Sequence, residues 1–435
     1  MLELFGSGLI SLWLDMAGVK VKPVDTLDVL ALQGKPGLVV ARDPNFVGES
    51  TIKRYLLQLQ AEKLVTAQQG IWMQSGPVLL ANHQGTVPFP AASLTKIATT
   101  ITALKTWGPN HQFETLISAT GPIVNGVLQG DLVINGGGDP MFVWEEGITL
   151  GNHLNKLGIR RVTGNLVITG AFAMNYTLDT VKAGAYLREA INSATWQRGA
   201  TKQHGEMAKG TPKPQVAIAG NIEVVPQVNY QPKLLIRHRS LPLKDILREM
   251  NIYSNNETSQ MLGELAGGAP VVMKTAASTA RVPESEIQLI NTSGLGVQNR
   301  ISPRAACAMF IALQRELAPY KLTVADLFPV SGRDKRGTML FRTMPKTTVF
   351  KTGTLNDVSA LAGVIPTGDR GLVWFAIINR GSNIEGLRAQ QDKLLQQLLG
   401  QLQVAPTLPA AVTWQKFPNP YSLFGSPSRN QIVAK

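Results

Sequence analysis

The sequence has little of what marks a disulfide scaffold, a membrane protein or a nucleic-acid-binding arm. It contains a single cysteine, Cys307, so it cannot form an internal disulfide, and the apolar neighbours of this residue favour a buried thiol. It has no run of about 18 uncharged apolar residues, the length that a membrane-spanning helix needs. Three consecutive Lys or Arg residues do not occur. We therefore expect no transmembrane helix and no nucleic-acid partner.

Patterns of metal and histidine chemistry are missing as well. The five histidines are scattered, and none lies near a paired carboxylate or a second histidine in the sequence. The chain has no HExxH motif, no GxxxxGK(S/T) loop, and no serine with glycine both two residues before it and two residues after it. These absences disfavour metal-dependent and histidine-based catalysis, and we expect no metal site.

Apolar material, by contrast, is plentiful. Of the 435 residues, 44% are hydrophobic and 16% are charged, which excludes a wholly disordered chain and, with the length, predicts about two or three domains. The 42 Lys and Arg residues outnumber the 29 Asp and Glu residues, and the net charge of +13 favours acidic partners such as a carboxylate-bearing polymer or an anionic lipid.

Hydrophobic periodicity gives the order of the expected elements. Apolar residues at helical spacing predict helices over residues 49–64, 94–107, 243–250, 256–266 and 387–402. Short apolar runs predict strands over residues 70–74, 78–82, 358–365 and 372–379. Between these two sets, residues 108–239 contain short β-like runs separated by Gly, Asn and Pro, with one plausible helix over residues 183–196. This pattern predicts an inserted β-rich domain.

The same patterns divide the chain into segments. We expect a discontinuous main domain in residues 41–107 and 240–404, an inserted domain in residues 108–239, and a loose tail in residues 405–435. The N-terminal segment, residues 1–40, contains the apolar stretch Leu4–Leu14 without the basic residues of an export signal. A degenerate signal, a mis-assigned start and a helix packed on the body all fit this segment.

Three short motifs carry the candidate chemistry, and each is weak alone. In chain order they are Ser93-Leu94-Thr95-Lys96, Ser254-Asn255-Asn256 and Lys351-Thr352-Gly353-Thr354. A second Ser-x-x-Lys occurs at Ser50–Lys53 and a second Ser-x-Asn at Ser428–Asn430, so chance matches are expected. Their surroundings must therefore separate a site from coincidence.

Ser93 and Lys96 have the surroundings that a nucleophile and its base need. They lie three residues apart at the start of an apolar helix, so both side chains share one face beside the free N–H groups of the first turn. Burial of Lys96, above all near another cation, would lower its pKa and yield a neutral amine that accepts a proton. Lys53 is followed by Arg54 on a charged helix, where an amine stays protonated. The alternative for Lys96 is a side chain that extends from an ordinary helix into water.

The other two motifs also have purely structural explanations. Ser254-Asn255-Asn256 precedes an expected helix, and these residue types are typical of a helix cap. Lys351-Thr352-Gly353-Thr354 begins a strand-like segment, where Gly353 would allow close approach of a substrate and a Lys with two Thr hydroxyls would hold a carboxylate. A surface strand with a glycine bulge is the alternative for this motif.

In this order, the three motifs resemble the active-site signature of penicillin-binding proteins and serine β-lactamases. Further segments extend the resemblance, over roughly residues 45–400, to the D-alanyl-D-alanine carboxypeptidase/endopeptidase family of low-molecular-mass class C penicillin-binding proteins. These segments are Pro90–Lys96, Gly130–Leu132 with Gly136–Pro140, Asn251–Asn256, Ser293–Leu295 with Asn299–Pro303, and Gly337–Met339.

The resemblance implies a fold and an architecture. The fold is α/β, more narrowly α+β: a penicillin-binding, β-lactamase-like transpeptidase domain with an antiparallel sheet flanked by helices, and one inserted β-rich domain. The 161 positions between Ser93 and Ser254 exceed the spacing in class A β-lactamases, and the insertion accounts for the excess. Where the family often has Asp-Gly before Ser-Gly-Leu, this chain has Asn291-Thr292.

The resemblance also implies a role for each motif residue. The implied catalytic residues are Ser93, which attacks the D-Ala-D-Ala carbonyl; Lys96, which accepts its proton; Ser254, which relays a proton to the leaving nitrogen; and Asn256, which orients Lys96. The implied substrate-binding residues, at the terminal carboxylate, are Lys351, Thr352, Gly353 and Thr354. The backbone N–H groups of Ser93 and Thr354 would form the oxyanion hole. The resemblance implies neither a metal nor an organic cofactor.

The expected function is that of a serine D-Ala-D-Ala carboxypeptidase that hydrolyses peptidoglycan stem peptides through an acyl-enzyme, with endopeptidase activity left open. The expected partners are these stem peptides and, as inhibitors, β-lactam antibiotics. This function implies the periplasm or cell envelope, and a peripheral association with the envelope is left open. Two alternatives on the same fold are a non-catalytic cell-wall or β-lactam-binding protein, and an esterase or β-lactamase.

Overall fold

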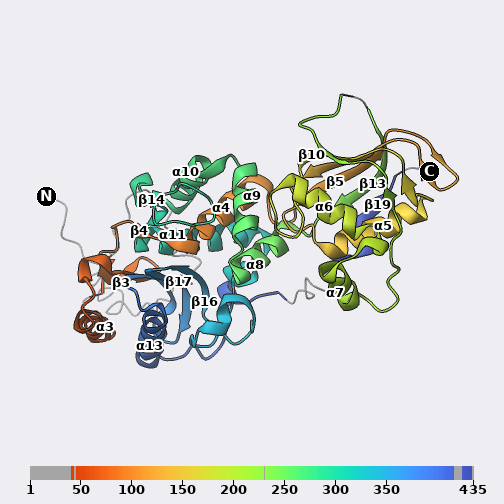
Figure 1. Ribbon diagram of the computed structural model, residues 1–435. Helices are drawn as coiled ribbons and strands as arrows, with labels where there is room; N and C mark the ends of the chain where they lie inside the picture. Colours follow the sequence, from red (N-terminus) through yellow and green to blue (C-terminus); the bar gives the residue numbers. More distant parts are fainter. Residues whose placement is uncertain (1–40, 44–45, 230, 416–423, 434–435) are drawn as a thin grey trace.

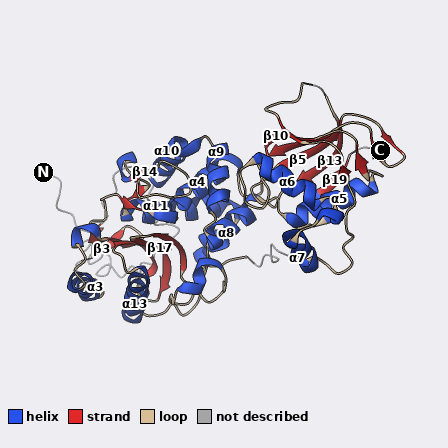
Figure 2. Cartoon of the chain, viewed as in Figure 1, coloured by secondary structure: helices blue, strands red, loops and turns tan. Residues whose placement is uncertain are grey.

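The computed structural model describes residues 41–43, 46–229, 231–415 and 424–433, so the interpretations of Leu4–Leu14 lie outside the described residues. The chain forms two lobes that lie side by side (Figure 1). The main lobe contains the elements between residues 41 and 107 and between residues 243 and 412, and the insert lobe contains the rest. Each lobe combines helices with strands (Figure 2).

A six-stranded sheet forms the centre of the main lobe within the described part of the chain. Its order is β1-β3-β2-β18-β17-β16, and neighbouring strands are antiparallel except for the short pair β1–β3. β2 pairs with β18, and Ile71 lies opposite Ile377, so the sheet joins residues from both sides of the insertion. The strands predicted over residues 70–74, 78–82, 358–365 and 372–379 are confirmed. The sheet consists of β1 (Ala41–Arg42), β2 (Gly70–Ser75), β3 (Val78–His83), β16 (Val349–Leu355), β17 (Val358–Thr367) and β18 (Gly371–Arg380).

The two faces of this sheet belong to two separate hydrophobic cores. Alternate residues of β18 enter them: Phe375 and Ile377 pack with α3 (Glu49–Ala61) and α13 (Ile384–Leu402), whereas Trp374 and Ala376 face the other core. Helices of the second core include the remaining long helices of the main lobe (Figure 1). They are α4 (Thr95–Trp107), α8 (Leu243–Tyr253), α9 (Asn256–Leu265), α10 (Gly268–Ala280) and α11 (Pro303–Leu317), with the short α12 (Val324–Leu327). The five predicted helices are confirmed, with small differences at their ends. Cys307 on α11 is fully buried, as expected, and burial raises the pKa of its thiol.

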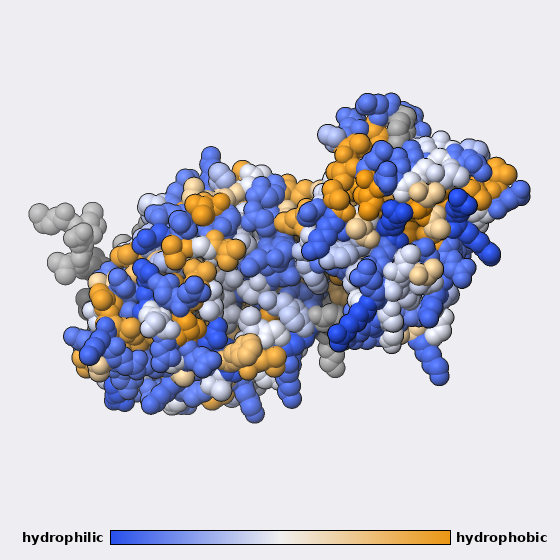
Figure 3. Space-filling view, in the orientation of Figure 1, coloured by the Kyte–Doolittle hydropathy of each residue, from blue (hydrophilic) through white to orange (hydrophobic). Residues whose placement is uncertain are grey.

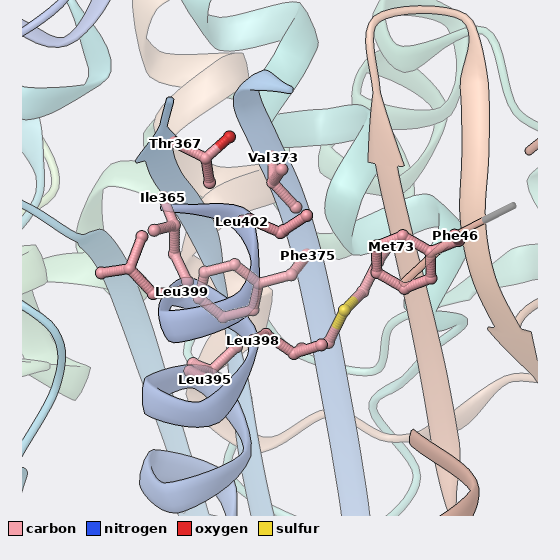
Figure 4. A pocket seen from close by; sticks show the side chains of 10 residues that line it. All are labelled: Phe46, Met73, Ile365, Thr367, Val373, Phe375, Leu395, Leu398, Leu399 and Leu402. Atoms are coloured by element: carbon pink, nitrogen blue, oxygen red, sulfur yellow. The ribbon is translucent and has the colours of Figure 1, made fainter. Parts of the chain in front are cut away.

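The core between α13 and the sheet contains a small void (Figure 4). Its volume is about 10 Å³, and its walls, which include Met73, Phe375 and Leu398, are apolar apart from Thr367. A space of this size holds about one water molecule at most. We therefore interpret it as a packing feature of the core and not as a ligand site.

The insert lobe is built on a second six-stranded sheet, counted over the residues that the structure describes. In its order, β12-β10-β8-β5-β13-β19, the first three strands are parallel and the last three are antiparallel to their neighbours. Its strands are β5 (Glu114–Ala119), β8 (Leu132–Gly137), β10 (Leu166–Ala171), β12 (Ile222–Val224), β13 (Lys233–Arg239) and β19 (Asn430–Ile432). The described residues also form two small sheets. One, in this lobe, consists of β6 (Ile123–Val124), β7 (Val127–Leu128), β9 (Arg161–Val162) and β11 (Ala217–Ile218). The other, in the main lobe, consists of β4 (Phe89–Pro90), β14 (Ile287–Gln288) and β15 (Arg300–Ile301). The domain boundaries at residues 108 and 239 stay a prediction.

The expectation of one helix within residues 108–239 is wrong. The described residues form three, α5 (Trp144–Lys156), α6 (Thr180–Ala190) and α7 (Arg198–Glu206), and α6 covers much of the expected segment. α5 escaped the sequence pattern because its buried face contains glycines, which lower helix propensity. The structure gives their reason: a Cβ at Gly147 would lie 2.7 Å from the Cβ of Ala190. The segment therefore contains three helices besides its strands.

The expectation of a loose tail after residue 404 is wrong for its described part. Val412 is buried in the main-lobe core, and the Gln415 N–H donates to Asp326 at 2.7 Å. Farther on, β19 pairs antiparallel with β13. Arg429 forms an ion pair with Glu146, whose side chain is fully buried in α5. Described parts of the tail thus contact both lobes.

The visible face of the molecule intermingles hydrophilic and hydrophobic residues on both lobes (Figure 3). Within the described ranges, each helix is too short or too polar to cross a membrane.

Candidate active site

Ser93 lies in a tight turn at the entrance of α4. A 3₁₀ turn over Ala92–Leu94 leads directly into this helix, and Ala92 has a φ of +48°, a left-handed conformation that is costly for a residue with a side chain. Strand β16 packs against the turn, where a Cβ on Gly353 would lie 2.7 Å from the Ala91 carbonyl oxygen and 3.1 Å from the Ser93 nitrogen. Only glycine at position 353 lets the strand approach the serine this closely.

The amine of Lys96 lies at the centre of a compact polar cluster. Its Nζ is 3.0 Å from Ser93 Oγ, and it donates hydrogen bonds to Asn256 Oδ1 and to the carbonyl oxygen of Ser293, both at 2.7 Å. The Lys96 side chain is fully buried. Asn256 is the first residue of α9, so two helices that are distant in sequence hold this amine.

Burial lowers the pKa of Lys96 to about 7, although the nearby carboxylate of Glu257 acts in the opposite direction. A substantial fraction of the amine is therefore neutral at neutral pH, as a proton acceptor requires. The alternative of a lysine extending into water is wrong for Lys96. A lysine in water is found instead at Lys53 of the second Ser-x-x-Lys motif, whose side chain is 71% exposed and forms a 3.2 Å ion pair with Glu49.

Ser254 occupies the junction between α8 and α9. It ends α8 in a left-handed conformation, with φ +55°, while Asn255 caps α9 by accepting a hydrogen bond from the Thr258 N–H at 2.7 Å. The helix-cap interpretation therefore holds for Asn255 alone. The side chains on either side of it are directed to the two lysines: Asn256 contacts Lys96, and Ser254 Oγ accepts a hydrogen bond from Lys351 Nζ at 2.8 Å.

Lys351 is also fully buried. Its Nζ donates to the Thr352 carbonyl oxygen at 2.6 Å in addition to Ser254, and burial, reinforced by the charge of Lys96, holds the pKa of its amine well below its ordinary value. The next residues of β16 run outward, from the buried Thr352 and Gly353 to the exposed Thr354. Thr352 donates a hydrogen bond to the hydroxyl of Thr338 at 3.0 Å. The structure thus brings all eight predicted site residues to one end of β16.

Two contributors to the site were not assigned a role from the sequence. The Ser293 carbonyl oxygen accepts from Lys96, and Asn291 Oδ1 holds the turn around it by accepting from the Gly294 N–H at 2.8 Å. Asn291 is the position where the family often has aspartate, and its amide oxygen makes a hydrogen bond that a carboxylate oxygen could equally accept. The second contributor is Arg388 of α13, whose Nη2 donates to Thr354 Oγ1 at 2.8 Å. The Ser-Gly-Leu motif pointed to the first, whereas no local pattern pointed to Arg388.

A cavity of about 240 Å³ lies beside Ser254, between the lobes. Residues of α8, of the insert lobe and of the C-terminal segment line it: Met141, Tyr176, Glu249, Tyr253, Asn255 and Phe424. Its lining includes Tyr253 and Asn255, the chain neighbours of Ser254, but none of the eight predicted site residues.

Comparison with known proteins decides the family. The sequence model of the D-Ala-D-Ala carboxypeptidase 3 (S13) family matches residues 55–182 and 191–400, which is most of the chain. The chain belongs to this family. It is accordingly a serine peptidase of the D-Ala-D-Ala carboxypeptidase/endopeptidase type, and the recognition from the sequence motifs is confirmed.

Individual relatives of this S13 peptidase agree with the assignment. It is 23% identical to the D-alanyl-D-alanine carboxypeptidase DacB of Haemophilus influenzae, over 67% of this chain and 80% of the relative. It is 24% identical to the carboxypeptidase DacB of Mycolicibacterium smegmatis, over 70% of this chain and 74% of the relative.

Solved structures show the same fold. A predatory peptidoglycan endopeptidase of Bdellovibrio bacteriovorus superposes with a TM-score of 0.67 at 22% identity, covering 80% of this chain and 96% of that one. A form of that endopeptidase acylated by penicillin G gives 0.68 at 23% identity, over the same shares of the two chains. Penicillin-binding protein 4 of Haemophilus influenzae gives 0.62 at 18% identity, covering 80% of this chain and 99% of that one. The predicted fold class is therefore confirmed.

Proposed function

We propose that this S13 peptidase hydrolyses peptidoglycan stem peptides ending in D-Ala-D-Ala through an acyl-enzyme on Ser93, in the periplasm or cell envelope. The observation that carries the proposal is the fully buried amine of Lys96, 3.0 Å from Ser93 Oγ, with a pKa of about 7. A neutral amine has two N–H groups and one lone pair. Asn256 Oδ1 and the Ser293 carbonyl oxygen accept the two N–H groups, which leaves the lone pair for the serine hydroxyl.

Acylation then follows from these contacts. Ser93 Oγ forms a bond to the carbonyl carbon of the penultimate D-alanine while Lys96 accepts the hydroxyl proton. The carbonyl oxygen becomes an oxyanion, for which we assign the backbone N–H groups of Ser93 and Thr354 as donors. The close approach of β16 to the serine turn, made possible by Gly353, supports this assignment because it brings the two backbones together.

The carbon–nitrogen bond then breaks, and the leaving D-alanine nitrogen needs a proton. We assign this relay to Ser254, whose hydroxyl accepts a hydrogen bond from Lys351 Nζ and can pass its own proton to the leaving nitrogen. Ser254 Oγ then takes up the proton that Lys96 removed from Ser93, so that the hydroxyl is restored and the amine is again a neutral base. In deacylation, a water molecule attacks the ester carbonyl, Lys96 accepts the proton of that water, and Ser93 Oγ leaves with a proton returned by Lys96. No atom beyond substrate, water and these side chains is needed.

The terminal carboxylate of the substrate belongs, in this proposal, at the outer end of the Lys351–Thr354 segment. Thr354 supplies a hydroxyl donor there and is exposed to an incoming ligand, whereas the Thr352 hydroxyl has to turn away from Thr338 before it can donate to the carboxylate. β-Lactams acylate Ser93 in the same way, as penicillin G acylates the related Bdellovibrio endopeptidase. The net charge of +13 suits an enzyme that works on carboxylate-rich peptidoglycan.

Labelling with a fluorescent penicillin, followed by peptide mapping by mass spectrometry, tests the proposal. We expect one adduct, on Ser93. Release of D-alanine from a stem pentapeptide and cleavage of a cross-linked muropeptide dimer, measured side by side, then give the balance of carboxypeptidase and endopeptidase activity. A folded protein without an adduct on any serine would instead favour a non-catalytic cell-wall-binding protein, and rapid hydrolysis of the penicillin itself would favour a β-lactamase.

A further inference from the structure

Helix α13 brings a positive charge to the carboxylate end of the proposed site. Arg388, in the second turn of this helix, is half-buried, and its Nη2 donates a hydrogen bond to Thr354 Oγ1 at 2.8 Å. α13 lies against the sheet that contains β16 and β17 (Figure 1). The guanidinium therefore reaches the edge of the site from an element that none of the three motifs includes.

Two carboxylates of neighbouring segments, Asp392 and Asp357, are paired with other groups. Asp392, one turn farther along α13, accepts hydrogen bonds from Arg342 Nε at 2.8 Å and from the Thr343 N–H at 2.7 Å. Asp357, in the turn that follows β16, forms an ion pair with Arg380. Within the described ranges, no carboxylate lies within the 4.0 Å of an ion pair with Arg388. Its charge is therefore available to a ligand.

The lysine of the motif is poorly suited to supply that charge itself. Lys351 is fully buried, and its Nζ is already engaged by Ser254 Oγ and the Thr352 carbonyl oxygen. Burial and the neighbouring Lys96 both disfavour its charged form. A ligand carboxylate beside Thr354 would thus meet the hydroxyl donor of Thr354 but no freely available cation on β16.

We propose that Arg388 is a specificity-determining residue that supplies the positive charge for the terminal carboxylate of the substrate and orients the Thr354 hydroxyl toward it. By donating to a lone pair of Thr354 Oγ1, the guanidinium leaves the hydroxyl hydrogen free to point at the ligand. This inference rests on the proposed function, because it assigns the carboxylate end of the same site. It implies that the enzyme discriminates charged from neutral C-termini through a helix outside its motifs.

The experiment compares two acyl-D-Ala-D-Ala peptides that differ only at the C-terminus, one a free carboxylate and one an amide. kcat/KM for each is measured with the wild type, with Arg388→Ala and Arg388→Lys, and with Lys393→Ala as a control. Lys393 is an exposed cation of the same helix. For Arg388→Ala we expect a loss of about tenfold or more on the carboxylate peptide, chiefly through KM, and little change on the amide. Arg388→Lys should recover part of the loss, and Lys393→Ala should behave as the wild type.

The outcomes separate this inference from the proposed function. An equal loss on both peptides, or no loss on either, would overturn the role of Arg388 while the wild-type activity stands. Turnover of the amide by Arg388→Ala shows that the variant is folded. Should the wild type turn over neither peptide, the acylation rates with penicillin G, which has a free carboxylate, and with its methyl ester are compared instead for the same variants. A wild type that neither penicillin acylates would overturn the proposed function.

Discussion

Lys96 and Lys53 occupy equivalent places in two Ser-x-x-Lys motifs, and their environments could hardly differ more. The Lys96 side chain is fully buried among three oxygen atoms, whereas that of Lys53 is 71% exposed and pairs with Glu49. Chemistry depends on the environment and not on the letters of the motif, because only desolvation makes the amine a base at neutral pH.

Replacement of the two serines tests this contrast directly. Ser93→Ala should abolish both penicillin labelling and peptide hydrolysis, because the atom that forms the acyl bond is gone. Ser50→Ala, the matched control, should leave both near the wild-type level. The measurement is gel fluorescence after incubation with fluorescent penicillin. The reverse pattern would move the active site to the exposed motif on α3.

The pH dependence of acylation follows from the pKa of Lys96. With a pKa of about 7, the amine is mostly protonated below that value and mostly neutral above it. The acylation rate constant should therefore fall about tenfold per pH unit below pH ~7 and level off above it. The measurement is the labelling rate from about pH 5.5 to about pH 9.5. Lys53→Ala should keep this profile, and a profile that still rises at about pH 9 would assign the base to a group with an ordinary amine pKa.

At the scale of elements, the contact between β16 and the serine turn determines the shape of the site. Gly353→Ala would place a Cβ 2.7 Å from the Ala91 carbonyl oxygen, so the strand has to move away from Ser93. We expect the labelling rate to fall by about a hundredfold or more, the usual effect of losing an oxyanion donor.

The control for this variant is Gly400→Ala on α13, where an added Cβ meets nothing within 4 Å. It should label as the wild type does, and it should be slightly more stable because alanine favours a helix. Wild-type labelling of Gly353→Ala, measured in the same assay, would mean that the strand and the turn do not jointly form the oxyanion site.

Element prediction succeeded for several segments with continuous or periodic apolar residues, did not extend to α10 and α11, and failed at α5, where burial is polar and glycine-rich. The strands β17 and β18 and the helix α13 have continuous or periodic apolar residues, and their sequences predict them. α5 buries Glu146 and two glycines, a pattern that is typical of a loop. The structure explains it, because Ala190 packs closely against Gly147 and Arg429 forms an ion pair with Glu146.

The same limit applies to the site. The three motifs predicted which side chains converge, because each motif positions its residues locally. The contact between Arg388 and Thr354 depends on how α13 crosses the sheet, and no local pattern encodes that. The carbonyl of Ser293 is equally invisible, since any residue supplies a carbonyl oxygen.

At the scale of the whole molecule, the C-terminal segment helps to hold the insert lobe together. Glu146 is fully buried. It accepts a hydrogen bond from the Gly425 N–H at 2.8 Å and forms an ion pair with Arg429. Asn430, in β19, accepts a hydrogen bond from His238 Nδ1 at 2.9 Å. Polar contacts in the interior of this lobe thus join the inserted segment to the C-terminal segment of the chain.

Arg429→Met should therefore destabilise the protein. It removes the guanidinium partner of the buried Glu146 carboxylate, and breaking a buried pair typically costs about 3–5 kcal/mol. Thermal denaturation should show a clearly lower Tm. The control is Lys202→Ala, which removes an exposed ion pair with Glu206 and should cost about 0.5 kcal/mol or less. Equal Tm values for the two variants would mean that the buried pair contributes no more than a surface pair.

Because the main sheet pairs distant parts of the chain, the activity of the site reports whether the chain has reached its native topology. Ile71 pairs with Ile377, and a contact between such distant parts of the chain forms only after a very long loop has closed. Ser93, Ser254 and Lys351 meet when that closure is complete. In a refolding mixture, the fraction of molecules that a fluorescent penicillin labels therefore measures the fraction with native topology. Compact chains that have formed their helices but have paired the wrong strands are not labelled.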